Sequence, residues 1–188
     1  MPRNPAPPPS PSRGLPLLLV AGLALAACGG TGPQLTLPAG ATTSSRAAED
    51  RVAAPSLRLT LFDGSGFDLG AHLSRDGRPV LLHLWASWCE ACREEMPAVD
   101  DAARRHPEVL FLGVAVQDDP AAAGVAARDM NVAYPTGADL EGVVQAAFPA
   151  PQLPATYLIA ADGTLLGAVY GGLGPRGLEN LVTRYLER

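Results

Sequence analysis

The sequence predicts an α/β fold with a central mixed β-sheet flanked by helices. Two nearly continuous apolar runs, 80–85 and 109–116, are each followed by a stretch of helical character, and this order predicts a parallel pair of buried strands. Near the C-terminus, the runs 156–159 and 165–170 flank an Asp-Gly turn, which is typical of an antiparallel hairpin. The predicted sheet is therefore mixed, with the hairpin at one edge.

The elements before the first buried strand are expected to form an N-terminal β-hairpin. Leucines alternate with polar residues over 57–61, and an Asp-Gly turn at 63–64 returns the chain toward 67–69. A second Asp-Gly turn, at 76–77, leads into the run 80–85. Such an apolar run is typical of a central strand that is covered on both faces.

Helices are predicted after each buried strand and at the C-terminus. The stretch from Cys89 to Arg105 follows the first strand, and 120–130 follows the second with a proline in its first turn. A short helix over 140–148 precedes the C-terminal hairpin, and a helix over 175–187 closes the chain. This alternation of strands and helices places helices on both faces of the sheet.

The N-terminus carries an export signal. An apolar run from about Leu15 ends in Leu-Ala-Ala-Cys at 25–28, follows Arg3 and Arg13, and is shorter than the ~20 residues of a spanning helix. The pattern resembles a bacterial lipoprotein signal, which implies that residues 1–27 are removed and that Cys28 becomes a lipidated N-terminus holding the chain at a membrane. The alternative is an ordinary secretory signal that is cleaved nearby, and in both cases the mature protein is exported.

A tether and one domain are expected after the signal. Residues 28–55 are rich in Gly, Ala, Ser, Thr and Pro, which is typical of flexible coil with a reach of about 25–30 Å. Residues 56–188 have the usual size of a single domain. The chain has a net charge of −5 and contains no lysine, so nucleic acid is not an expected partner.

Cys89 and Cys92 are the candidate catalytic residues. A strand that leads into a helix start directs free backbone N–H groups and the positive end of the helix dipole at the first sulfur, which favours its thiolate form. The thiolate is the nucleophile in disulfide exchange. The two-residue spacer places Cys92 one helical turn away, close enough to displace a partner from Cys89 and close an internal disulfide.

Half of a zinc site or a structural disulfide is the alternative explanation of this cysteine pair. Zinc normally needs four ligands, but the chain has no second cysteine pair and only three histidines, His72, His83 and His106. No histidine follows Cys92 directly, as covalent haem attachment would require. We therefore expect redox chemistry with no metal and no cofactor.

Three blocks of sequence, in this order, carry a resemblance to a known family. They are LWASWCEACREEMP at 84–97, Tyr-Pro-Thr at 134–136 with Asp139, and LPATYLI at 153–159 with the Asp-Gly turn at 162–163. Together they resemble the thioredoxin superfamily, within its TlpA/ResA-like branch of membrane-tethered extracytoplasmic thiol-disulfide oxidoreductases. The resemblance implies a thioredoxin-like fold for 56–188, with a central insertion between Val116 and Asp139.

The same resemblance implies a role for each matching residue. Cys89 would be the attacking thiol and Cys92 the resolving thiol. Pro154 would follow a cis peptide bond, and the backbone of Leu153 would border the groove that receives a partner chain. Trp88, directly before the dithiol, would contact the partner as well.

Glu95 and His83 are weaker candidates for proton relay. Relatives of the ResA type place an acid at the position of Glu95, although an unassigned helical Glu is ordinarily a solvated side chain. His83 lies six residues before Cys89, where thioredoxins often hold a buried acid, and it could accept the proton of Cys92. The alternative is a neutral histidine with one satisfied hydrogen bond.

Charge near the dithiol bears on the direction of electron transfer. Glu90, Glu94 and Glu95 oppose the helix dipole, so their charge is expected to raise the pKa of the thiols and make the dithiol a reductant. One departure from many relatives is Ala91, which stands where they carry proline.

The expected function is reduction of disulfides in exported proteins, such as the haem-site cysteines of apocytochrome c. The protein would work outside the cytoplasm as a monomer and take electrons from a membrane donor of the thiol-disulfide relay type. A disulfide-donating oxidase is the main alternative. A peroxidase is disfavoured because Ala86 stands where a threonine would be required, and a non-enzymatic module because both cysteines are present.

Overall fold

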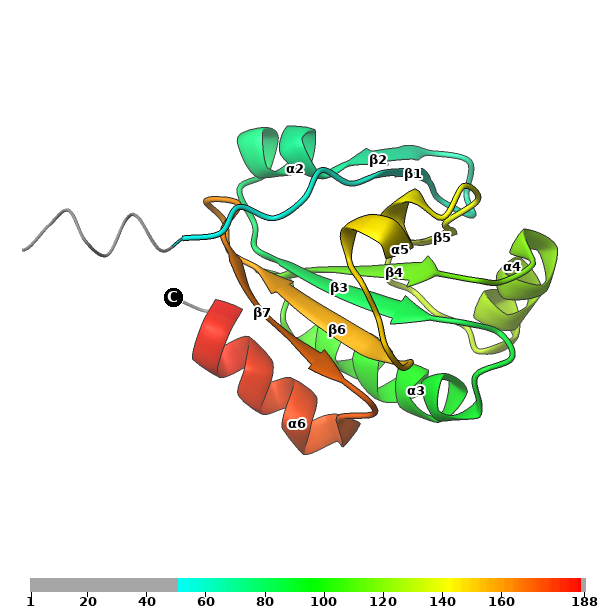
Figure 1. Cartoon of the computed structure of the whole chain (residues 1–188). Helices are drawn as coiled ribbons and strands as arrows, with labels where there is room; N and C mark the ends of the chain where they lie inside the picture. Colours follow the sequence, from blue (N-terminus) through cyan, green and yellow to red (C-terminus); the bar gives the residue numbers. More distant parts are fainter. Residues whose placement is uncertain (1–50, 187–188) are drawn as a thin grey trace, which may run out of the picture. The chain divides into compact units, whose positions relative to one another are not determined.

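The computed structural model describes residues 51–186. The expected signal, Cys28 and most of the tether lie outside these residues. A five-stranded sheet with the order β5-β4-β3-β6-β7 forms the centre of the domain, and β1 and β2 form a separate hairpin (Figure 1). The strands are β1 Arg58–Thr60, β2 Gly66–Asp68, β3 Val80–Trp85, β4 Leu110–Ala115, β5 Thr136–Ala138, β6 Ala155–Ile159 and β7 Leu165–Tyr170.

The strand pairing makes the sheet mixed, as predicted. Strand β3 runs parallel to β4, and β4 runs parallel to β5. Strands β6 and β7 form the antiparallel hairpin, and β6 joins the sheet antiparallel to β3. All six residues of β3 and all six of β4 are buried. The near-continuous apolar runs of the sequence therefore occupy the centre of the sheet.

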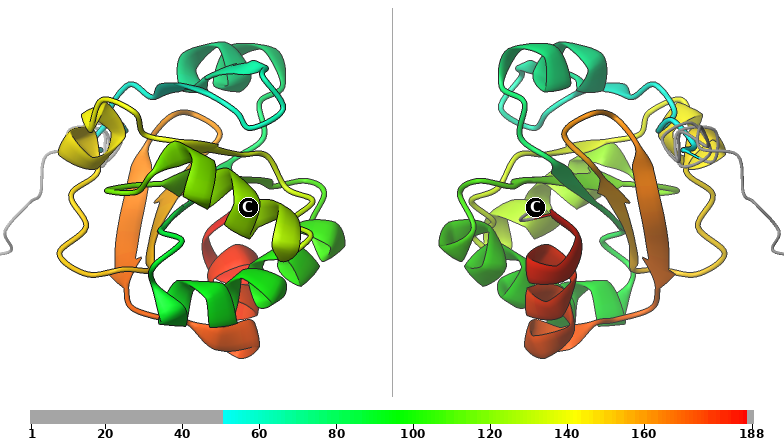
Figure 2. Two further views of the ribbon diagram at one scale, coloured as in Figure 1. Left: turned by 90° about the vertical axis from the view of Figure 1, so that its right-hand side faces the viewer. Right: turned by 90° about the vertical axis from the view of Figure 1, so that its left-hand side faces the viewer.

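Helices cover both faces of the sheet (Figures 1 and 2). The hairpin, α2 and α5 pack with Leu82 and Leu84 on one face. On the other face α3 and α6 pack with Leu81, and α4 packs with Trp85 near the end of β3. The helices are α2 Leu69–Arg75, α3 Glu90–Arg105, α4 Pro120–Asp129, α5 Val143–Ala147 and α6 Gly174–Leu181, which continues as a π-helical segment, η1 Val182–Leu186. The thioredoxin-like layers expected from the sequence are confirmed.

Two elements were not predicted. Leu69 was expected to end the hairpin but begins α2, because the Asp68 side chain accepts a hydrogen bond from Ala71 N at 2.8 Å and caps a helix of seven residues. Strand β5 has only three residues, and its pairing with β4 is a long-range contact. Both elements are too short to produce a periodic pattern in the sequence.

Residues at the end of the expected tether pair with the turn between β6 and β7. Ala53 forms an antiparallel bridge with Thr164, Ala54 N donates to Gly163 O at 2.8 Å, and Leu165 N donates to Val52 O at 2.8 Å. The ordered domain therefore starts before Ser56. This pairing uses backbone groups, so the composition of the segment does not indicate it.

Candidate active site

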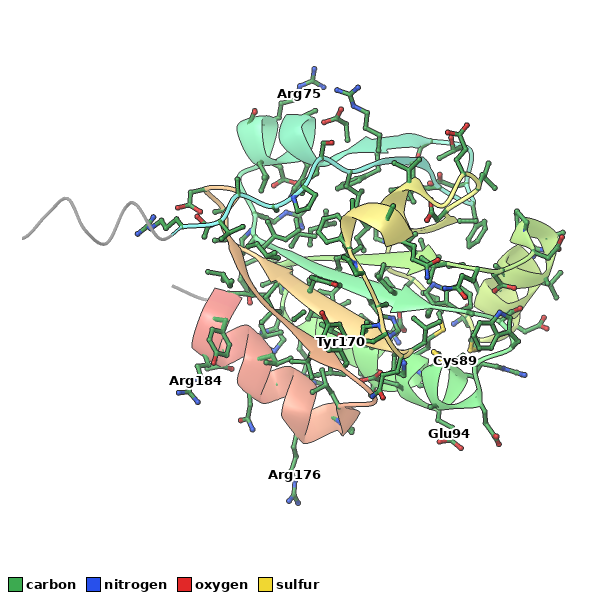
Figure 3. All side chains as sticks on the ribbon, in the orientation of Figure 1. Arg75, Cys89, Glu94, Tyr170, Arg176 and Arg184 are labelled. Atoms are coloured by element: carbon green, nitrogen blue, oxygen red, sulfur yellow. A yellow bond between two sulfur atoms is a disulfide. The ribbon has the colours of Figure 1, made fainter. Side chains whose placement is uncertain are left out.

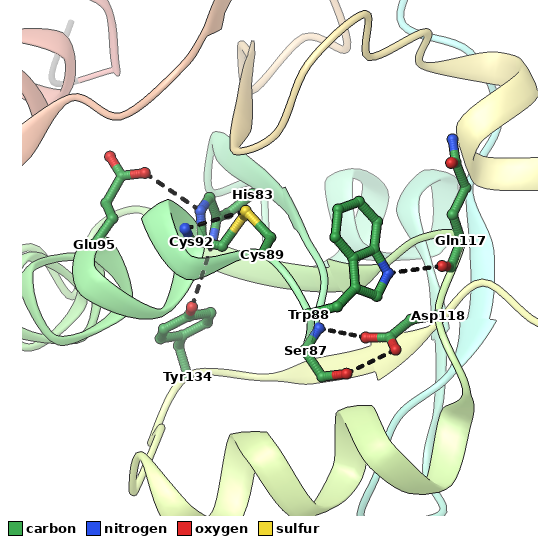
Figure 4. The surroundings of a disulfide bond; sticks show 9 residues. All are labelled: His83, Ser87, Trp88, Cys89, Cys92, Glu95, Gln117, Asp118 and Tyr134. Carbon is green, nitrogen blue, oxygen red and sulfur yellow. Dashed lines mark hydrogen bonds and ion pairs between the residues drawn. A yellow bond between two sulfur atoms is a disulfide. The ribbon is translucent and has the colours of Figure 1, made fainter.

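The dithiol lies where β3 meets α3. Cys89 is the N-cap of α3 in an extended conformation, and its Sγ accepts a hydrogen bond from Cys92 N at 3.2 Å. Cys89 and Cys92 are joined by a disulfide (Figure 4). When the bond is reduced, the free N–H groups and the dipole of a 16-residue helix act on Cys89 Sγ and favour its thiolate. The predicted setting of the pair is confirmed.

The two sulfurs differ in their access to solvent. Cys89 is 8% exposed, whereas Cys92 is fully buried. Cys92 belongs to a cluster of small and apolar residues that includes Met96 and Trp85. Cys89 is therefore the more accessible of the two cysteines, which is the asymmetry that an attacking and a resolving thiol require.

The loop before β6 lies against the dithiol. The peptide bond between Leu153 and Pro154 is cis, as the resemblance implied. Leu153 is partly buried and packs against the cluster that contains Cys89 and Cys92. The carbonyl of Pro154 accepts a hydrogen bond from Gly171 N at 2.8 Å, which ties the loop to the end of β7.

Trp88 lies directly before Cys89 and is held by the β4–α4 loop. The residue is 62% exposed, and its Nε1 donates to Gln117 O at 3.0 Å. Next to it, Ser87 donates from its backbone N–H and from its hydroxyl to the Asp118 carboxylate, at 2.5 and 2.8 Å (Figure 4). The β4–α4 loop thus clamps the segment that leads into Cys89.

This clamp was not predicted from the sequence. Asp119 caps α4 by accepting from Ala122 N at 2.8 Å, so it accounts for one of two consecutive acids before Pro120. Asp118 is the acid that the cap leaves unexplained, and this is the signal that the sequence offered. Its partner, Ser87, lies 31 positions earlier in the chain, so no local pattern joins the two.

His83 and Glu95 lie together behind the disulfide (Figure 4). Both are buried, and His83 Nε2 lies 3.7 Å from Glu95 Oε2, although neither atom has a hydrogen-bond partner. The other carboxylate oxygen of Glu95 accepts from Leu173 N at 2.8 Å. Two unpaired buried atoms that face each other can share a proton or hold a water between them.

Tyr134, in the segment between α4 and β5, contacts this buried pair. Its hydroxyl lies 3.5 Å from His83 Nδ1, and burial, followed by the charges of Asp100 and Glu95, raises the pKa of Tyr134, so the phenol keeps its proton. Gly113 pairs with His83 across the sheet, and a Cβ at Gly113 would lie 2.9 Å from the Tyr134 ring. Glycine at this position therefore gives the tyrosine room beside His83.

The three glutamates of α3 do not act together. Glu95 is turned inward to Leu173, whereas Glu90 and Glu94 are exposed, as Figure 3 shows for Glu94. Charges on the two exposed side chains are screened by water and salt. Of these three glutamates, Glu95 is therefore the one whose charge water and salt screen least.

The described part of the chain offers two further observations. None of its helices is both long and apolar enough to cross a membrane. Within residues 51–186, no group of three or more His, Cys, Asp or Glu side chains could hold a metal ion.

A redox disulfide at a helix start, beside a cis-proline loop on a mixed sheet, defines the class of thioredoxin-like thiol-disulfide oxidoreductases. The sequence matches a model of the AhpC/TSA family over residues 51–167. The chain belongs to this family, a branch of the thioredoxin superfamily.

Individual relatives agree with this assignment. Soluble secreted antigen MPT53 of Mycobacterium tuberculosis is 32% identical over 123 residues, which are 65% of this chain and 68% of that protein. Thiol-disulfide oxidoreductase ResA of Bacillus thuringiensis is 24% identical over 159 residues, covering 84% and 89% of the two chains. The solved structure of dsbF from Mycobacterium tuberculosis superposes with a TM-score of 0.63 at 32% identity, covering 69% of this chain and 94% of that one. The chain is thus similar to oxidoreductases of the ResA and Dsb type.

Proposed function

We propose that this protein reduces disulfides in exported proteins through Cys89 and Cys92. The supporting observation is the asymmetry of the two sulfurs, because the partly exposed one lies at the helix start and the buried one lies one turn behind it. The Cys89 thiolate attacks a partner disulfide, forms a mixed disulfide and expels one partner thiolate. Cys92, as a thiolate, then attacks Cys89 Sγ and releases the second partner thiolate. Two electrons pass to the partner, and the enzyme is left with its internal disulfide.

The resolving step requires that buried Cys92 lose its proton. We propose that His83 and Glu95 receive it, because their unpaired Nε2 and Oε2 atoms face each other beside the dithiol. The buried Tyr134 keeps its proton and orients the imidazole through Nδ1. Leu153 packs against the cluster that contains the dithiol, and Trp88 is exposed directly before Cys89, so both contribute to the surface that receives the partner chain, while Pro154 shapes the loop that carries Leu153.

The main alternative within this proposal is electron transfer in the opposite direction. A disulfide-donating oxidase would use the same residues in reverse. The reduction potential of the Cys89–Cys92 couple, measured by equilibration with glutathione or dithiothreitol buffers, separates the two. A value near or below thioredoxin's, about −270 mV, supports a reductase, whereas one near about −120 mV identifies a disulfide donor. Absence of a reversible couple would refute the oxidoreductase function.

The particular client is a finer proposal. Resemblance to the TlpA/ResA-like branch supports apocytochrome c as a substrate and a membrane thiol-disulfide relay as the electron donor. Deletion of the gene is expected to lower the amount of haem-bound cytochrome c, and added dithiothreitol is expected to restore it. An unchanged cytochrome content in the deletion strain would direct the search to other exported disulfide proteins.

We also propose that the protein works outside the cytoplasm on a lipid anchor at Cys28. The Leu-Ala-Ala-Cys pattern supports the anchor, and the name of the mycobacterial relative, a soluble secreted antigen, supports export. The variant Cys28→Ser is expected to leave the membrane fraction of cells. A protein that stays with the membrane in this variant would require another means of attachment.

A further inference from the structure

The loop at 149–154, here called the partner loop, carries Leu153 and Pro154 to the dithiol. Three of its six residues are prolines, which have no N–H to donate, so the loop depends on its carbonyl groups for hydrogen bonds to the rest of the domain. At its far end, Pro154 O accepts from Gly171 N at 2.8 Å. At its near end, Pro149 O accepts from the hydroxyl of Tyr157.

A second tyrosine completes the contact at Pro149. The hydroxyl oxygens of Tyr157 and Tyr170 lie 3.3 Å apart. A carbonyl can only accept, so the single hydroxyl proton of Tyr157 goes to Pro149, and Tyr170 must be the donor to Tyr157. The chain of hydrogen bonds therefore runs from Tyr170 to Tyr157 to Pro149, and each bond polarises the next.

Packing fixes both tyrosines on the sheet, and Tyr170 lies at its active-site end. Tyr157 is 4% exposed and stacks edge-on against Phe148, with ring centroids 5.2 Å apart. The ring of Tyr170 lies edge-on to Tyr157, with centroids 6.2 Å apart. In the strand register, Leu84 is opposite Ala155, which is opposite Tyr170, so Tyr170 lies two strands from the end of β3 that leads to Cys89 (Figure 3).

We infer that Tyr157 and Tyr170 are positioning residues that hold the partner loop in the shape that receives a polypeptide disulfide. Tyr170 is linked to Pro149 through Tyr157, and the next residue, Gly171, donates to Pro154. Both ends of the loop are therefore connected to consecutive residues at the end of β7. The inference rests on the proposed function, because it assigns the loop the role of pairing with the partner backbone. Neither tyrosine touches the sulfurs, so the pair acts on binding of an extended chain and not on sulfur exchange itself.

Two substrates separate these effects. Insulin supplies disulfides within polypeptide chains, whereas DTNB is a small disulfide with no backbone to pair with the partner loop. With Tyr157→Phe, the KM for insulin is expected to rise about two- to tenfold, the range that one neutral hydrogen bond supplies. Its kcat and the rate with DTNB are expected to stay within about twofold of wild type, as one hydrogen bond far from the sulfurs implies.

A double-mutant cycle tests the order of the hydrogen bonds. Tyr170→Phe is expected to raise the same KM by a smaller factor, and the double variant is expected to behave like Tyr157→Phe alone, because Tyr170 acts through Tyr157. Tyr185→Phe is the matched control, because Tyr185 is 41% exposed against 43% for Tyr170 and lies in η1. Its KM should be unchanged.

Several results would overturn the inference. They are an unchanged KM in folded Tyr157→Phe, an equal loss with insulin and DTNB, and additive effects in the double variant. Pro149 is exposed, so water can replace the tyrosine and the variant should fold. Should it not fold, the KM of Tyr170→Phe decides. A wild-type enzyme that reduces neither substrate would instead refute the proposed function.

Discussion

At the scale of single residues, burial separates the roles of the two cysteines. The variant Cys92→Ser keeps the accessible sulfur of Cys89 but lacks the resolving thiol, so it is expected to accumulate a mixed disulfide with its partner. Cys89→Ser is expected to form almost none, because Cys92 is fully buried. Non-reducing electrophoresis and mass spectrometry of the adduct measure both. Equal adduct from the two variants would show that burial does not control access.

Glu95 offers a second test at this scale. If Glu95 and His83 take up the proton of Cys92, Glu95→Gln is expected to slow exchange at least about tenfold at neutral pH. The deficit should shrink as pH rises past about 8.5, the ordinary pKa of a thiol, because the thiol then ionises without help. Stopped-flow kinetics across pH measure this convergence.

Glu94→Gln is the control for Glu95, because it removes the neighbouring carboxylate, which is exposed on the same helix. Its exchange rate is expected to stay within about twofold of wild type, since exposed charges are screened. A deficit in Glu95→Gln that is constant across pH would show that the carboxylate supports packing at Leu173 and does not move a proton.

At the scale of secondary-structure elements, the β4–α4 loop holds the approach to the dithiol. Asp118→Ala removes the acceptor for both hydrogen bonds from Ser87 and is expected to lower the free energy of unfolding by about 1–3 kcal/mol and to change the reduction potential. Asp119→Ala removes only the cap of α4, so it is expected to cost about 1 kcal/mol with the potential unchanged. Urea unfolding and redox titration of both variants provide the comparison. Equal potentials in the two would mean that the clamp does not act on the sulfurs.

At the scale of the whole molecule, α6 is joined to the end of α3 by charged side chains. The carboxylate of Glu179 accepts from His106 Nε2 at 3.2 Å and from Arg105 at 3.1 Å, and these contacts hold the pKa of Glu179 below its ordinary value of 4.5. Since the folded pKa is below the unfolded one, the stabilisation is present above about pH 4.5 and is lost as pH falls through the folded value.

In Glu179→Gln, the free energy of unfolding is therefore expected to fall less steeply with decreasing pH than in the wild type. Urea unfolding at a series of pH values from about 3 to about 6 would show a smaller slope than wild type, because the variant lacks this linked proton. Glu141→Gln, at an exposed carboxylate outside the contact, serves as the control. A wild-type slope in Glu179→Gln would show that other carboxylates govern acid unfolding.

The start of the domain is also a property of the whole molecule. A chain that begins at Arg51 keeps the pairing of Val52 and Ala54 with the turn between β6 and β7, whereas one that begins at Ser56 loses it. The shorter chain also lacks the exposed ion pair between Arg51 and Asp162, whose atoms lie 2.8 Å apart. It is expected to be less stable by about 1–3 kcal/mol, from two backbone hydrogen bonds and this ion pair. Both should retain the redox couple. Equal urea midpoints would place the functional boundary at Ser56.

The class of the fold and the cysteine pair could both be predicted from the order of residues alone. Val80–Trp85 was predicted with its observed bounds, because a strand covered on both faces must be apolar throughout. Cys89 and Cys92 were found because their chemistry depends on a spacing of three residues and a helix start, both of which are local. The cis bond before Pro154 followed from the resemblance and is present.

Contacts between residues that are distant in the chain could be seen only in the folded domain. Ser87 meets Asp118, His83 meets Glu95, and Tyr157 meets Tyr170 only through folding, because no local pattern in the sequence joins the members of each pair. The same applies to β5, which is too short to show a pattern of its own and forms because β4 lies beside it. A site formed by residues close in the chain can be predicted from their spacing, whereas contacts between distant side chains depend on tertiary packing, which residue spacing does not specify.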